Sequence, residues 1–298
     1  MGRILINAIN ELFGGPISDL LIYGILTNVE WAFMTWQDEL EASADRLAQT
    51  PANFFGGDVL ALLQVFSNTI ILPIAVSIFG LIVAYEFVSM LAEGNNFRDF
   101  DYTHLFKWMA KVVIGAFLLS NVFPIINWIF SLGAAAVVAV QGILNVEALD
   151  TATIFENLEE ALRNDYDVSV LINIWLTSFL LGFFMIVCRI MITVIVIYRM
   201  FLIVLKISLA PIPFATLINR EWSNVGNNYI KLLMATSFQG FLMMVVLGLY
   251  GIMMTLVYAP NTAAEALVTM FVILALSVML IMLLLKSQQI AKSIFGAS

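Results

Sequence analysis

The sequence predicts an all-α, polytopic membrane helix bundle. Of its 298 residues, 62% are hydrophobic and only 11% are charged, whereas soluble domains are about half apolar and about a quarter charged. Several uncharged or nearly uncharged stretches reach the roughly 20 residues that a helix needs to cross a bilayer. These observations predict about five transmembrane helices, and they exclude an ordinary soluble domain and a disordered chain.

The reactive side chains exclude several kinds of site. Cys188 is the only cysteine and His104 the only histidine, so the chain cannot form an internal disulfide and has no zinc-binding set. It contains no phosphate-binding glycine loop, catalytic triad or pair of catalytic carboxylates. We therefore expect no cofactor, no metal and no catalysis. The net charge of −8 also argues against binding nucleic acid through the overall field.

Residues 1–68 predict an external, amphipathic N-terminal region. Apolar residues between Asp19 and Trp36 recur near a helical period, with polar residues between them. Such a helix could lie in the outer membrane interface or pack on the loops of the bundle, and the pattern fits both. The acidic run that follows, Asp38–Arg46, predicts a solvated face.

Five apolar stretches follow this region. Residues 69–144 contain the first two, which flank a predicted cytoplasmic loop at residues 92–111, and residues 168–298 form a membrane core with the other three. In order, the stretches are Thr69–Leu91, Val112–Val146, Val168–Cys188, Leu232–Ala264 and Ala266–Leu285.

Residues 145–167 separate the second stretch from the third and form an acidic, external segment. Four apolar residues in it have helical spacing: Ile154, Phe155, Leu158 and Leu162. The segment is either a short amphipathic helix that covers the outer face or a solvated loop.

The basic residues predict the orientation of the chain. Lys and Arg stay preferentially in cytoplasmic loops. Assigning alternate loops to the cytoplasm places ten of the thirteen basic residues there. The N-terminus is then outside and the C-terminus inside.

One further tract, Ile190–Leu217, is long enough to cross the membrane. A crossing would bury Arg199 and Lys206, each at a cost of about 2.5–3.5 kcal/mol near the membrane centre. Two prolines in Ala210–Pro213 also interrupt helical hydrogen bonding. We therefore expect a cytoplasm-facing extension and a re-entrant or interfacial cytoplasmic elbow, residues 199–231.

Three charged side chains fall within or beside these apolar tracts, and intramembrane charges often mark function. They are Glu86, Arg189 and Arg199. Glu86 and Arg189 could pair across helices, or each could reach the headgroups by snorkelling. Arg199 and Lys206 are seven residues apart and share a helix face. Anionic lipid is their expected partner, with a passing polyanion as the alternative.

Uncharged polar residues in the spans are expected to join helices by hydrogen bonds rather than to line a conduit. Gly80 and Ala84 have the spacing that lets helices approach closely, which fits a homo-oligomer. The polar residues are Asn121, Asn127, Asn173, Thr177, Ser237 and Gln239.

The stretch Ser208–Met243 reads SLAPIPFATLINREWSNVGNNYIKLLMATSFQGFLM. It resembles the core of the TrbL-like conjugal transfer proteins of Gram-positive mobile elements, relatives of the sixth VirB subunit of type IV secretion systems. The likeness extends to Phe106–Trp108 and to Ala291–Phe295. Nearly everything after Asn68 fits that family's layout, whereas the first 60 residues fit it less clearly and the acidic external segment fits it least.

The resemblance implies a subunit of the bacterial cytoplasmic-membrane complex that passes DNA and protein out of a donor cell. Its implied partners are other membrane subunits, the ATPases that drive transfer, and the DNA–protein substrate in transit. It also implies that the elbow docks cytoplasmic partners. The docking residues would be Lys206, Pro211, Pro213, Asn219, Arg220, Glu221 and Trp222. Alternatively, Asn219–Glu221 only caps and turns the chain.

Two other functions fit parts of the pattern. A membrane scaffold that anchors a secretion or envelope complex, without lining the path, would have the same sequence features as a channel subunit. A small-solute transporter typically has internal repeats and ionisable residues near the membrane centre. The last two apolar stretches contain no charged residue, so the transporter fits less well.

Overall fold

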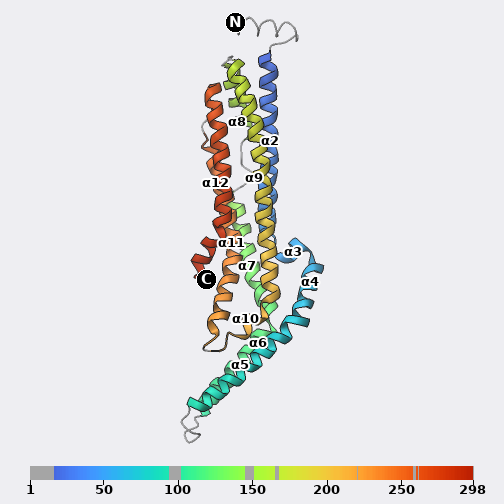
Figure 1. Cartoon of the computed structure of the whole chain (residues 1–298), viewed down its shortest axis with the longest axis vertical. Coiled ribbons are helices and arrows are strands. Elements are labelled where there is room, and N and C mark those ends of the chain that lie inside the picture. The colour runs from blue at the N-terminus through green and yellow to red at the C-terminus, as the bar shows by residue number, and fades with distance from the viewer. Residues whose placement is uncertain are drawn as a thin grey trace. The chain divides into compact units, whose positions relative to one another are not determined.

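The computed structural model is built from helices (Figure 1). Within the residues it describes there is no strand, which confirms the predicted all-α fold. The described residues are 17–93, 102–144, 151–164, 168–219, 221–257, 260 and 262–297.

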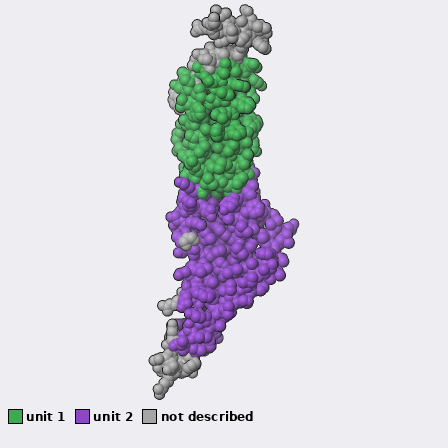
Figure 2. Space-filling view, viewed as in Figure 1, with its two compact units in different colours: residues 1–45, 140–196, 243–285 green, residues 46–139, 197–242, 286–298 purple. Residues whose placement is uncertain are grey.

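The chain divides into two compact units, which Figure 2 shows in different colours. Unit 1 contains residues 1–45, 140–196 and 243–285. Unit 2 contains residues 46–139, 197–242 and 286–298.

Six helical segments in the described part of the chain are long and apolar enough to cross a membrane. Together with the composition, they establish a multi-pass membrane protein. The segments are 57–92, 103–120, 122–144, 170–209, 223–254 and 264–295.

The sixth segment arises where the sequence predicts one long stretch, Val112–Val146. The structure divides this region into α6 (Tyr102–Ser120) and α7 (Val122–Leu144). Helical hydrogen bonding nevertheless continues across Asn121, whose N–H donates to the Phe117 carbonyl at 3.1 Å and whose carbonyl accepts from the Ile125 N–H at 3.2 Å. Pro124 has no N–H to donate, which favours a kink at this point. The two helices therefore form one kinked helical path.

Unit 2 begins with three short elements, α3 (Pro51–Phe55), α4 (Gly57–Phe66) and the π-helical turn η1 (Ser67–Ile71). Gly56 separates α3 from α4 with φ +80°, a left-handed conformation that glycine adopts at no steric cost. The chain continues into α5 (Leu72–Glu93). The described core of this unit packs residues from six helices, including Ala75, Leu119, Ile126, Ile203, Phe214 and Leu233.

In unit 1, the first described helix is α2 (Ile17–Ala48). Its buried face packs on other helices of the unit, with contacts to α9 (Val168–Leu209) and α11 (Ser223–Thr255), whereas the sequence predicted packing on the loops of the bundle or in the outer membrane interface. This face includes Ile22, Ile25, Val29, Phe33, Trp36 and Leu40.

The sequence predicted that the acidic run in α2 is solvated. This is wrong for part of the run. Glu39 and Ser43 are buried, because they follow Trp36 at three and seven residues and so lie on the same helix face. Asp38 and Glu41 are exposed, as expected.

The acidic segment, which the sequence predicts to be external, contains a helix, α8 (Thr151–Asn164). Leu158 and Leu162, two of the four residues whose spacing predicted it, are buried. The amphipathic alternative for this segment is therefore confirmed, and the solvated loop is wrong for residues 151–164.

The elbow is shorter than the predicted residues 199–231. Helix α9 (Val168–Leu209) continues through the first part of that range, and α11 (Ser223–Thr255) occupies the last part. The change of direction is confined to residues 210–222, which include α10 (Pro211–Ala215). At 1.5 Å per residue α9 is about 63 Å long, roughly twice the hydrocarbon thickness.

Candidate functional site

The elbow in unit 2 begins with a proline-led helical turn. Pro211 and Pro213 occupy the first turn of α10, where a missing N–H leaves no helical hydrogen bond unmade. The prolines therefore end α9 and start α10 without disrupting either helix. Pro211 is buried and Pro213 is half-buried, so these two residues of the predicted docking set mainly shape the backbone.

The elbow is packed against α11. The Phe214 and Tyr229 rings pack edge to face, with 6.4 Å between their centroids. The Tyr229 hydroxyl also donates a hydrogen bond to the Lys206 carbonyl. A Cβ on Gly226 would lie 2.7 Å from the Pro213 carbonyl oxygen, so α11 approaches the elbow backbone closely. These contacts hold the turn in one position.

Asn219 acts locally, as the capping alternative predicted. Its side chain is only 2% exposed, and Oδ1 accepts hydrogen bonds from the backbone N–H groups of Glu221 at 2.7 Å and Trp222 at 3.0 Å. Its carbonyl accepts from the Ser223 N–H at 2.8 Å. Asn219 therefore shapes the start of α11. Arg220 lies outside the described residues.

Among the described members of the predicted docking set, Glu221 and Trp222 are exposed. Trp222 is 53% exposed. The Tyr85 hydroxyl, on α5, lies 3.2 and 3.3 Å from the two carboxylate oxygens of Glu221. The elbow surface thus presents an aromatic side chain beside a carboxylate that is fixed in place.

The three charged residues that the sequence predicts within or beside the membrane spans have different partners. Glu86 on α5 forms a salt bridge with Lys111 on α6, with 3.3 Å between Oε1 and Nζ. Arg189 on α9 instead pairs with Glu39 on α2, with 3.6 Å between Nε and Oε2. Glu86 and Arg189 thus each pair with another residue, and the structure does not bring them together as the predicted pair.

Glu39 has further partners that explain why a carboxylate can be buried. Its Oε1 accepts hydrogen bonds from the Thr193 hydroxyl at 2.7 Å and the Ser43 hydroxyl at 3.1 Å. Buried carboxylates are stable only when they are paired and hydrogen-bonded in this way. The cluster joins α2 to α9 within unit 1.

A second polar chain in unit 1 links four helices. The Trp36 indole donates to the Tyr250 hydroxyl at 2.8 Å. That hydroxyl lies 3.1 Å from the Ser277 hydroxyl on α12 (Ala263–Phe295). Ser277 in turn lies 3.7 Å from the Met185 sulfur. All four residues are buried, so the chain positions helices and is not open to a ligand.

Arg199 is held inside unit 2. It is only 5% exposed, and its Nη2 atom donates a long bond of 3.5 Å to the Ser237 carbonyl on α11. The neighbouring Lys206 donates through Nζ to the Thr236 hydroxyl. Both side chains therefore turn towards α11, although only the Arg199 side chain is fully buried.

Two of the uncharged polar residues act as the sequence predicted. The Ser237 hydroxyl donates to the Ile129 carbonyl on α7 at 2.8 Å, and the Gln239 amide donates to the Ser287 hydroxyl on α12 at 3.3 Å. Both bonds cross between helices of unit 2. Thr177, by contrast, bonds the Asn173 carbonyl of its own helix at 2.7 Å.

The sequence model of the TrbL/VirB6 plasmid conjugal transfer like protein family matches residues 37–211. This range is more than half of the 298 residues. The chain belongs to this family. Comparison with curated proteins and with solved structures gave no match.

The matched range differs from the range on which the resemblance rested. It starts within α2 and ends at Pro211, so it leaves out most of Ser208–Met243 and the exposed pair Glu221 and Trp222. It includes the acidic segment and part of the first 60 residues, which were the parts expected to fit the family least clearly. The TrbL/VirB6 assignment is therefore confirmed, through a largely different part of the chain.

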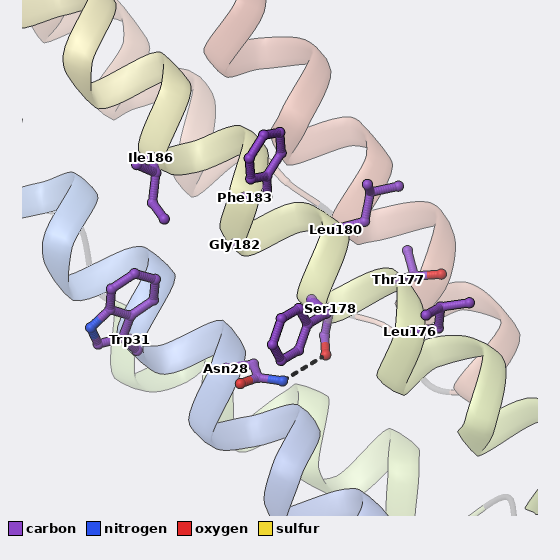
Figure 3. A pocket seen from close by; sticks show the side chains of 10 residues that line it. Asn28, Trp31, Leu176, Thr177, Ser178, Leu180, Gly182, Phe183 and Ile186 are labelled. Carbon is purple, nitrogen blue, oxygen red and sulfur yellow. Dashed lines mark hydrogen bonds between the residues drawn. The ribbon is translucent and has the colours of Figure 1, made fainter.

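Unit 1 also contains an apolar groove (Figure 3). Most of the residues that line it belong to the range that the family model matches. The groove has a volume of about 750 Å³ and lies between α2 and α9. The Asn28 amide donates to the Ser178 hydroxyl at 3.4 Å within it. The described residues that line the groove are all uncharged. Its lining is Asn28, Trp31, Leu176, Thr177, Ser178, Phe179, Leu180, Gly182, Phe183 and Ile186.

Sequence reasoning missed Glu39, Trp36 and Tyr250 as members of polar clusters. A signal was present for Glu39, because it follows Trp36 by three residues on the apolar face of the predicted helix. No local signal existed for Tyr250, whose partner Trp36 is 214 residues away in the sequence.

Proposed function

We propose that this TrbL/VirB6 family protein is a cytoplasmic-membrane subunit of a type IV secretion machine for conjugation. It helps to form the platform or channel through which DNA and protein leave the donor cell. The family match over residues 37–211 carries the proposal, and the six apolar helices support a multi-pass subunit. The chain performs no catalysis of its own, and partner ATPases supply the energy.

The kinked path of α6 and α7 supports five crossings. The α6 segment has the lowest mean hydropathy of the six, 1.2 against 3.0 for the α12 segment, and it carries Lys107 and Lys111. If α6 enters from the cytoplasmic interface and α7 completes the crossing, the basic loops stay inside. The N-terminus is then outside, and the elbow and C-terminus are inside.

On this orientation the elbow faces the cytoplasmic partners. Trp222 is exposed on a backbone held by Asn219 and by the packing of α10, and fixed aromatic side chains are common anchors of protein interfaces. Glu221 adds a carboxylate for a charge-assisted contact. Lys206 and the prolines support this surface from within. The partners of this surface are the machine's ATPase and membrane subunits.

A scaffold that does not line the path is the second candidate. Ser237 and Gln239 are buried and bonded to neighbouring helices, which favours a structural use of these polar groups. A photocrosslinking residue at the exposed Asn173 separates the two candidates, with the buried Ser237 as a matched control position. Adducts with substrate trapped in transit support a channel. If no exposed position in the spans gives adducts while conjugal transfer is unimpaired, the scaffold is supported.

The function itself is tested by deleting the chain from its donor and measuring conjugal transfer. We expect transfer to be lost, and to return when the full-length chain is supplied from a second locus. As a control, the levels of the other transfer proteins should be unchanged in the deletion strain. Transfer at the parental rate without this chain would overturn the proposal.

A further inference from the structure

A group of cations that form no salt bridge with any described residue lies in unit 2. Within the described residues, the Nε and Nη1 atoms of the buried Arg199 have no hydrogen-bond partner. Its one contact, with the Ser237 carbonyl, is long at 3.5 Å. Burying a charge without a counter-charge is costly, because the protein interior solvates ions poorly. Arg199 is therefore a group that an anion would stabilise.

Two lysines extend this group towards the surface. Lys206 on α9 and Lys292 on α12 are half-buried. The end of α12 that carries Lys292 packs on α11, where the ring centroids of Phe295 and Phe238 lie 5.6 Å apart. In the part of the chain that the structure describes, no carboxylate forms a salt bridge with any of the three cations. An approaching anion would meet the two lysines first, with the field of Arg199 behind them.

The packing of α11 fixes Arg199 in this position. A Cβ on Gly240 would lie 2.4 Å from Nη2 and 2.8 Å from Cζ of Arg199. Only glycine therefore leaves room for the guanidinium against this helix. The buried arginine is part of the close packing of α9 on α11.

We propose that Arg199, Lys206 and Lys292 form a binding site for the phosphate headgroup of an anionic phospholipid. The lysines bind the headgroup at the surface, and Arg199 attracts it from inside the bundle. The side chains around the lysines favour a lipid over a nucleic-acid backbone, because exposed apolar residues flank them on both helices and can contact acyl chains. These are Phe201, Leu205, Leu209, Ile290 and Ile294. The site does not depend on the proposed role in transfer.

The test is a binding titration of the full-length chain, purified in neutral detergent, with fluorescent phosphatidylglycerol. The variant Lys206→Gln/Lys292→Gln removes the two surface cations. The control Lys231→Gln/Lys286→Gln removes two exposed cations of the same unit, one from α11 and one from α12. We expect the first variant to bind about thirtyfold more weakly, since each basic residue near a lipid surface contributes about fivefold. The control should bind nearly as wild type, and equal weakening in both variants would overturn the proposal.

Two further arms identify the ligand. Phosphatidylcholine, which has the same phosphate but no net charge, should bind weakly and equally to all variants. A short single-stranded DNA oligonucleotide tests the other phosphate source. If it binds more tightly than phosphatidylglycerol and is lost in Lys206→Gln/Lys292→Gln, the site belongs to nucleic acid and the lipid proposal is wrong.

Arg199→Met separates the binding role from a structural one. Replacing a buried unpaired cation by an apolar side chain of similar length is often neutral or stabilising. We therefore expect an unchanged or higher thermal unfolding midpoint together with weaker binding of phosphatidylglycerol. A lower midpoint with unchanged binding would show that Arg199 serves only the packing.

Discussion

The Nε atom of Arg189 lies 3.6 Å from the Oε2 atom of Glu39, although the two residues belong to helices far apart in the sequence. The pair joins α9, which is long and apolar enough to span a membrane, to α2, which is not among the six segments with that property. In unit 1, α2 is thus held by buried polar groups as well as by its apolar face.

Removing the charge of Glu39 should loosen α2. For Glu39→Gln we expect the free energy of unfolding in detergent to fall by about 1–3 kcal/mol, because Arg189 and two hydroxyls lose an ionised acceptor. Glu41→Gln, an exposed change on the same helix, should have little effect. If both variants melt at the wild-type temperature, the buried pair does not stabilise α2.

The indole of Trp36 should matter through its hydrogen bond as well as its bulk. Trp36→Phe and Tyr250→Phe each remove the 2.8 Å bond, and each should cost about 1 kcal/mol or somewhat more. The double variant should be less destabilised than the sum, because both changes remove the same bond. Trp31→Phe, at an exposed position of the same helix, is the control. Strict additivity in this double-mutant cycle would contradict the contact.

Gly133 permits the close approach of α7 and α11 in unit 2. A Cβ there would lie 2.1 Å from the Ser237 Oγ and 2.9 Å from its carbonyl oxygen. Gly133→Ala should therefore lower the free energy of unfolding by about 1–3 kcal/mol. A Cβ on Gly80 would have no neighbouring atom within 4 Å. The control Gly80→Ala should therefore leave the free energy of unfolding unchanged or slightly raised. Equal effects of the two substitutions would be inconsistent with this packing.

Trp222 should affect transfer without affecting folding. Trp222→Ala removes an exposed aromatic side chain, so we expect a thermal unfolding midpoint near that of wild type. Loss of an interface anchor typically costs about 2 kcal/mol or more, and we expect transfer to fall by at least about tenfold. Trp128→Ala, at another exposed tryptophan, is the control for a general membrane effect. If donors with Trp222→Ala transfer at the parental rate, the proposal that the elbow docks cytoplasmic partners is wrong.

Much of the fold was predictable because lipid-spanning helices leave a strong signal in hydropathy. The apolar stretches, the helix at residues 151–164 and the interhelical bond of Ser237 all followed from composition or periodicity. The kink at Asn121 and the length of α9 did not, since an uncharged run contains no mark of where a helix bends. Arg199 and Lys206 suggested an interruption in α9, but the helix continues because both side chains find places against α11.

The candidate site was less predictable, because it depends on partners distant in the sequence. Asn219, in a short loop, was correctly anticipated as a local cap. Arg189 was recognised as unusual, but its partner Glu39 was assigned to a solvated run. Which charges meet is decided by the packing of helices, and one sequence does not contain that information.

The orientation of the chain is the claim on which the elbow's docking role depends, and labelling with an impermeant thiol reagent tests it most directly. Single cysteines would replace Glu159 or Trp222 in a Cys188→Ala background, where the buried native thiol cannot contribute. The account predicts that Cys at position 159 is labelled on intact donor cells, and Cys at position 222 only after the membrane is opened. Labelling of position 222 on intact cells, with position 159 protected, would contradict it.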